Sequence, residues 1–181
     1  MDKADGVTMK RGLRGAKKAP QGFAETGTDG REKRVRRDDD IFTAVKAWQD
    51  DKNAAEKKYG PIGEWDTSKV TTMCRLFGGM THFNEDISRW NVANVTTMHE
   101  MFTGASSFNQ PLEQWNVTNV TTMYEMFINA AAFNQPLEQW NVGNVTTMGG
   151  MFYVASAFNQ QLEQWNVANV TTMQEMFTGA S

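Results

Sequence analysis

The side chains best suited to chemistry are few in this sequence and fall at unrelated positions. It has two histidines, His82 and His99, and one cysteine, Cys74. Acid–base catalysis and metal binding need such groups in matched sets at fixed spacing. No glycine-rich phosphate loop follows a predicted strand, and no nucleophile-elbow motif is present. We therefore expect a protein that is not an enzyme and that uses no cofactor or metal.

The charge distribution argues against nucleic acid as a ligand of most of the chain. The net charge is −3, but residues 1–40 hold 11 Lys/Arg against 8 Asp/Glu, and no Lys or Arg follows Arg89. Binding to phosphates needs clustered cations. The basic run Lys33–Arg37 fits a nuclear-import or polyanion-binding tract, or a solvated charge run, and we interpret it as the latter.

A 25-residue repeat dominates the sequence. Tryptophan recurs at Trp65, Trp90, Trp115, Trp140 and Trp165, and Val, Met, Phe and Asn positions keep the same step. There are four complete copies over residues 65–164 and a fifth that is incomplete. Self-similarity at a period of roughly 20–50 residues is typical of a solenoid.

Hydrophobic spacing within one copy predicts two elements. Apolar residues at steps of three and four, with Thr and Glu at capping-box spacing, predict helices near Thr97–Ala105, Thr122–Ala130 and Thr172–Ala180. Gly149-Gly150 should weaken the equivalent helix of the fourth copy. Alternation of Trp115 and Val117 with Gln114 and Asn116 predicts a strand near Gln114–Val117. The expected fold is an α/β solenoid, a right-handed coil with parallel strands on one face and helices on the other.

Three regions are expected along the chain. Residues 1–40 are charged and poor in large apolar side chains, which predicts a disordered N-terminal tail, with no regular structure over residues 1–35. Residues 41–64 are predicted to form a helical N-terminal cap, with acidic residues before each of two helical turns and Gly60-Pro61 ending the second. Residues 65–181 form the repeat array.

The repeat string resembles a known family. The pattern W-N-V-x-N-V-T-T-M-x-x-M-F-x-x-A-x-x-F-N-Q is similar to that of the BspA-like leucine-rich-repeat surface proteins, and the segment from Ala44 to Asp66 is similar to the usual start of such arrays. The resemblance covers residues 41–181. It implies a leucine-rich-repeat-like fold and a role in adhesion or protein binding, and it brings no catalytic residues.

Most conspicuous side chains are expected to be structural. The ten repeat methionines fit copper(I) binding or an apolar binding groove, but their helical spacing with Phe favours a place in the core. The tryptophans, on the apolar side of each predicted strand, are also expected in the core. Two asparagine sets are expected to form ladders that satisfy backbone groups. These are Asn94, Asn119, Asn144 and Asn169, and Asn84, Asn109, Asn134 and Asn159. The first set also lies in N-V-T glycosylation sequons, which we interpret as a by-product of the repeat.

The outward strand face is the predicted partner-binding surface. Its three candidate columns are Gln114, Gln139 and Gln164, then Asn116, Asn141 and Asn166, and finally Glu113, Glu138 and Glu163. Unit charges about 5 Å apart in water repel by only about 0.8 kcal/mol, so the acidic column is tolerable while solvated. It favours a cation or a basic partner, and a solvated rim without ligand is the alternative.

Three functions remain open. The first is a protein–protein interaction module that binds an extended or basic protein surface. The others are a cell-surface adhesion protein, as the resemblance implies, and a calcium- or polysaccharide-binding module. No membrane span and no signal peptide is visible, so the chain is intracellular as written and at the cell surface if the resemblance governs. The fifth copy lacks its return segment, which predicts that the chain is a fragment of a longer array or that another copy or a partner covers this end; the isolated chain should then self-associate.

Overall fold

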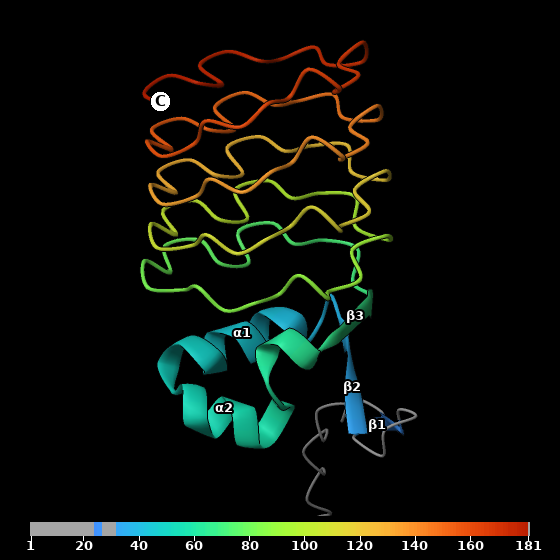
Figure 1. Cartoon of the computed structure of the whole chain (residues 1–181). Coiled ribbons are helices and arrows are strands. Elements are labelled where there is room, and N and C mark those ends of the chain that lie inside the picture. Colours follow the sequence, from blue (N-terminus) through green and yellow to red (C-terminus); the bar gives the residue numbers. More distant parts are fainter. Residues whose placement is uncertain (1–23, 27–31, 181) are drawn as a thin grey trace, which may run out of the picture.

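The computed structural model describes residues 24–26 and 32–180, and it shows a stack of similar coils above a small N-terminal cap (Figure 1). The elements are β1 (Ala24–Thr26), β2 (Glu32–Arg37), α1 (Ile41–Asp50), α2 (Lys52–Tyr59), a 3-10 turn (Ile62–Glu64) and β3 (Asp66–Lys69). The three strands form one sheet in the order β1-β2-β3, in which β1 is antiparallel and β3 is parallel to β2.

Two helices, α1 and α2, form in the segment that the sequence predicts to be helical. Ile41, Ala44 and Val45 of α1 are buried against the first coil, as their spacing on one helix face predicts. The Asp51 carboxylate accepts a hydrogen bond of 3.0 Å from the Ala54 N–H and so caps α2. The α2 helix ends at Tyr59 and is followed by Gly60, whose φ of 77° is costly for other residues.

The predicted disordered tail is wrong for part of residues 1–40. Strands β1 and β2 lie within it, and residues 1–23 and 27–31 are outside the described part. Arg36 of β2 is buried, with its guanidinium 5.1 Å from the Tyr59 ring centroid and 4.9 Å from that of Trp65. Its Nη1 also lies 2.8 Å from Asp40 Oδ2. The charge run predicted a solvated segment because sequence composition cannot reveal a cation enclosed by two rings and a carboxylate.

The predicted repeat helices are wrong in every described copy. Residues 97–105 form consecutive turns, and their N–H groups alternate between two kinds of acceptor. The Met101 N–H binds the carbonyl of Met98, whereas the Phe102 N–H binds the Met126 carbonyl of the next coil at 2.9 Å. A series of short turns buries residues three and four positions apart, as a helix does. Hydrophobic periodicity alone therefore cannot distinguish such turns from a helix.

Residues in the left-handed backbone conformation explain why no helix forms in the coils. Glu100 and Glu125 have φ of 52° and 53°, and Gly150 occupies the same place in the next coil with φ of 60°. An α-helix does not tolerate this conformation, but it suits glycine. Gly150 therefore favours the observed backbone instead of weakening a helix.

The predicted strand at Gln114–Val117 is also absent, although its inward and outward faces are as predicted. Two turns replace it, closed by the Trp115 N–H to Leu112 carbonyl and Val120 N–H to Val117 carbonyl bonds. Trp115 and Val117 are buried, whereas Gln114 is exposed. Parallel bridges occur elsewhere, one per junction, where Thr72, Thr97, Thr122, Thr147 and Thr172 follow one another.

The core is a stack of equivalent side chains from successive coils. The Phe102 and Phe127 rings lie 5.4 Å apart and nearly parallel, and each continues a column of repeat phenylalanines. Each repeat tryptophan is buried, and its indole N–H donates to a backbone carbonyl, as Trp140 does to Leu112 at 2.9 Å. These contacts confirm the core interpretation of the tryptophans and phenylalanines; most repeat methionines are buried with them.

The N-terminal end of the stack is closed by a carboxylate. In interior coils the N–H and hydroxyl of one threonine donate to the preceding coil's threonine carbonyl, as Thr96 does to Thr71. In the first coil, Asp38 takes the place of that carbonyl, because its two oxygens accept from the Thr71 N–H and hydroxyl. The segment that follows β2 thus stands where a preceding coil would lie.

Candidate functional site

The glutamine column is the free part of the predicted partner-binding surface. Gln114, Gln139 and Gln164 are exposed at equivalent points of successive coils. Their side-chain amides form no hydrogen bond with any residue that the structure describes. Each amide therefore offers two donors and an acceptor to a ligand.

The neighbouring asparagine column is half occupied by local bonds. Asn116 and Asn141 are exposed, and each Oδ1 accepts from a backbone N–H two residues on, that of Thr118 and of Gly143, both at 3.2 Å. Asn166 does the same with the Ala168 N–H. Such Asx turns hold the amides in place and leave the Nδ2 donors directed to solvent or a ligand.

The glutamate column adds negative charge at the same edge. Glu113 and Glu163 are exposed and Glu138 is half-buried. Within residues 32–180, these carboxylates have no lysine, arginine or histidine nitrogen within ion-pair distance. Because the sequence has no Lys or Arg after Arg89, the charge of this surface is uniformly acidic.

A surface hollow lies where these three columns meet. Its volume is about 450 Å³, and its lining comes from two successive coils. Five of the predicted residues line it, namely Glu138, Gln139, Asn141, Gln164 and Asn166, together with Trp140 and Val142. The sequence predicted these residues from their outward alternation, and the fold places them around one concave feature.

A different set of amides forms hydrogen bonds between coils. Asn109 Oδ1 accepts from the Asn134 N–H and from Gln135 Nε2, both at 2.9 Å, and Asn84 and Asn134 repeat this pattern. In the other predicted ladder, Asn119 Nδ2 donates to the Ala93 carbonyl at 2.8 Å. The ladder interpretation is confirmed for Asn84, Asn109 and Asn134, and for all four members of the other set. That other set is exposed at the surface instead of buried, and its members are Asn94, Asn119, Asn144 and Asn169.

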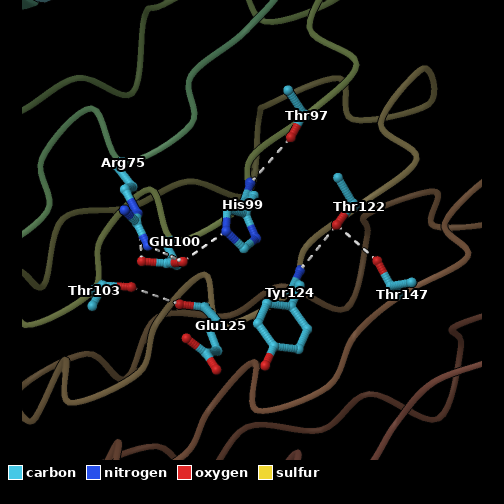
Figure 2. Close-up of polar contacts among 9 residues, drawn as sticks. All are labelled: Arg75, Thr97, His99, Glu100, Thr103, Thr122, Tyr124, Glu125 and Thr147. Carbon is cyan, nitrogen blue, oxygen red and sulfur yellow. Dashed lines mark hydrogen bonds and ion pairs between the residues drawn. The ribbon is translucent and has the colours of Figure 1, made fainter.

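Sequence reasoning missed a polar row on another side of the coils (Figure 2). Arg75 binds the Glu100 carboxylate through Nε at 2.6 Å and Nη2 at 2.7 Å, and His99 Nε2 lies 2.6 Å from Glu100 Oε1. The Arg75 guanidinium and, with it, His99 hold the pKa of Glu100 below its ordinary value. The signal was available, because Arg75 and Glu100 occupy equivalent positions of successive copies.

The same row continues through an aromatic pair. The His99 and Tyr124 rings stack with centroids 5.3 Å apart, and hydrogen bonding to Glu125 raises the pKa of the Tyr124 hydroxyl. A Cβ on Gly149 would lie 3.2 Å from the Tyr124 ring, so the glycine makes room for it. This row is held together by its own ion pair and ring contacts, which makes it a structural brace between coils.

The described residues were also searched for metal-binding clusters and for membrane-spanning helices. Residues 24–26 and 32–180 contain no group of three or more His, Cys, Asp or Glu arranged to hold a metal ion. In that same part of the chain, no helix has both the length and the apolar character needed to cross a membrane.

Comparison with known proteins gives one significant match. Neither curated proteins nor solved structures include a significant relative of this chain. A family profile described as "Mycoplasma protein of unknown function, DUF285" matches residues 43–152 and 116–181, which together include most of α1, all of α2 and the coils. The chain therefore belongs to this repeat family of unknown function, DUF285.

Proposed function

We propose that this chain is a non-enzymatic solenoid repeat protein that binds a protein partner through its outward Gln, Asn and Glu columns. The observation that carries the proposal is the unbonded glutamine column beside the hollow of about 450 Å³. Every other repeated amide column in the described coils spends at least one polar atom on the array itself.

The chemistry of the columns indicates the kind of partner. The parallel bridges between coils space neighbouring backbones at about 4.8 Å, and amides at equivalent positions of successive coils follow this repeat. An extended peptide with exposed backbone groups matches such a row, because amides both donate and accept. The acidic column alongside favours lysine or arginine side chains in that peptide and gives specificity and faster association.

Selection from a random peptide library tests the proposal while the natural partner is still unidentified. Peptides that bind the intact chain should be enriched in Lys and Arg. Their affinity should fall at least about tenfold for the triple variant Gln114→Ala, Gln139→Ala and Gln164→Ala, which corresponds to about 1.4 kcal/mol or more. Replacing Glu113, Glu138 and Glu163 by Gln should weaken binding and reduce its dependence on salt.

A matched control lies on the other side of the array. Gln174 and Glu175 are exposed and do not line the hollow, so changing both to alanine should leave peptide affinity unchanged. Equal losses for the control and the glutamine triple variant would refute the proposed surface. So would selected peptides with no excess of basic residues.

Adhesion at a cell surface is the second candidate function. The likeness of the W-N-V-x-N-V-T-T-M-x-x-M-F string to BspA-like surface proteins supports it, whereas the DUF285 family is itself of unknown function. In cells that produce the protein naturally, brief protease treatment of intact cells should then degrade it, while a cytosolic marker survives. Full protection until lysis would reject surface exposure.

A further inference from the structure

Five Asn-x-Thr sequons lie in the coils, and their asparagine side chains are bonded in two different ways. Four belong to the asparagine ladder, whose members are Asn94, Asn119, Asn144 and Asn169. The fifth is Asn116-Val117-Thr118, which comes directly before a ladder sequon. Enzymes that attach N-linked sugars recognise this pattern and transfer the sugar to the asparagine Nδ2. The bonding of each Nδ2 therefore decides which sequon the folded chain can offer.

Every ladder asparagine uses its Nδ2 to join two coils. Asn119 Nδ2 donates to the Ala93 carbonyl of the preceding coil at 2.8 Å, and Asn144 Nδ2 donates to the Thr118 carbonyl at the same distance. The other two members make the equivalent bond at 2.8 and 2.6 Å. A transferase must draw the nitrogen into its own active site, which breaks the ladder bond and leaves a backbone carbonyl without its donor. The ladder sequons are thus exposed but protected.

Asn116 has the opposite arrangement. Its side chain is exposed, and its Nδ2 has no hydrogen-bond partner within residues 32–180. Its Oδ1 accepts a hydrogen bond of 3.2 Å from the Thr118 N–H, and this Asx turn holds the amide at the surface. A donor at Oδ1 also stabilises the negative charge that the amide develops when Nδ2 loses a proton. The fold therefore leaves this nitrogen free and favours its deprotonation.

Thr118 is the residue that makes this turn a sequon. The equivalent asparagines of the other coils form the same turn, with Oδ1 bonded to the N–H two residues on. Their second following residue has no hydroxyl: Asn91, Asn141 and Asn166 are followed by Ala93, Gly143 and Ala168. Among the described coils, one alone combines a free Nδ2, an Asx turn and the required hydroxyl.

We propose that Asn116 is an N-glycosylation site, and that it is the one of the five sequons that a transferase modifies on the folded chain. The donor is a sugar nucleotide. Asn116 Nδ2 attacks the anomeric carbon of the sugar, and the bond from that carbon to the diphosphate oxygen breaks as the nitrogen–carbon bond forms. The Nδ2 proton passes to a base of the transferase, and the nucleoside diphosphate leaves.

Incubation of the intact chain with UDP-glucose and a soluble, sequon-specific N-glycosyltransferase tests the proposal. The intact mass should rise by one hexose per chain. Cleavage after Glu113 and Glu125 releases a fragment that contains both Asn116 and Asn119, and tandem mass spectrometry should place the sugar on Asn116. Its modification should be at least about tenfold faster than that of any ladder asparagine, because only the ladder bonds must break.

Thr118→Ala and Thr118→Ser form a matched pair. Ala93 makes the equivalent turn with a bond of 3.1 Å, so the fold should accept alanine at this place. Thr118→Ala should abolish the modification of Asn116, whereas Thr118→Ser keeps a hydroxyl and should retain it. Ala93→Thr should add a second modified position at Asn91, because that exposed asparagine then gains the hydroxyl it lacks.

Short synthetic peptides establish whether the fold is the cause. A peptide with the Asn116 sequon and one with the Asn119 sequon should be modified at similar rates. Three results would overturn the proposal: no sugar on Asn116 of the folded chain, equally fast modification of the ladder asparagines there, or the same preference for Asn116 in the peptides. The mass readout involves no peptide ligand, so its outcome is independent of the proposed partner binding.

Discussion

Two amide columns of the same repeat have opposite roles. Asn84, Asn109 and Asn134 bind the next coil's backbone and a glutamine amide, so each is part of the array. Gln114, Gln139 and Gln164 recur just as regularly and bind nothing that the structure describes. Regular recurrence alone therefore does not distinguish a structural amide from one that is free for a partner. The difference is whether the side chain points along the stack or away from it.

The largest effect that tests this comparison comes from the residue next to the free column. Trp115→Ala should lower the free energy of unfolding by about 3–5 kcal/mol, because it removes a buried aromatic ring and leaves the Ile87 carbonyl without its indole donor. Gln114→Ala should change it by no more than about 0.5 kcal/mol. Urea unfolding measures both, and similar losses would mean that the inward and outward faces are misassigned.

The two amide columns can be compared directly by truncation. Asn109→Ala should cost about 1–3 kcal/mol of unfolding free energy, because the Asn134 N–H and Gln135 Nε2 both lose their acceptor. Gln139→Ala should stay within about 0.5 kcal/mol. If both variants unfold at the wild-type urea concentration, the bonded column contributes no more than the free one.

The Asp38 cap predicts a pH-dependent loss of stability. Burial raises its pKa, but hydrogen bonds from Thr71 and Thr72 outweigh this and hold the pKa of Asp38 below its ordinary 3.8. A carboxylate with a lowered folded-state pKa stabilises the fold above the unfolded pKa, and this contribution disappears as pH falls through the folded pKa. Thermal melts should show Asp38→Asn less stable than wild type at neutral pH, with the gap closing below about pH 4.

Asp39→Asn is the control for that experiment, since Asp39 is exposed beside Asp38 and its replacement removes the same charge. The melting temperature of this variant should track wild type at every pH. A gap between Asp38→Asn and wild type that persists unchanged in acid would show that Asp38 does not act as a carboxylate acceptor.

The smallest effect concerns the left-handed backbone conformation of two equivalent residues, Val154 and Asn129. Val154 has a φ of 54°, which is strained for a β-branched residue, whereas Asn129 fills the equivalent place with a φ of 57°. Val154→Asn should raise the unfolding free energy by about 0.5–1 kcal/mol, and Asn129→Val should lower it by a similar amount. Changes of the same sign in the two variants would contradict a conformational cause.

The sequence determined the repeat period, the helical cap and the buried face of each copy. These follow from local chemistry, because Trp115 and Val117 must leave water wherever their backbone lies, and Asp51 caps α2 through the nearby Ala54 N–H. The outward Gln, Asn and Glu columns follow for the same reason: alternation fixes which side chains stay in solvent.

Only the tertiary structure decided the backbone of each coil and the use of its polar groups. Residues 97–105 have the periodicity of a helix, yet alternate N–H groups among them bind the next coil, and no local pattern encodes that exchange. Likewise, the acidic residues before α1 predict a helix cap, yet the Asp38 carboxylate accepts a hydrogen bond from the Thr71 N–H, where interior coils use the carbonyl of the preceding coil. Coil-to-coil bonds join residues that are distant in sequence, so their partners become visible only once the chain is stacked.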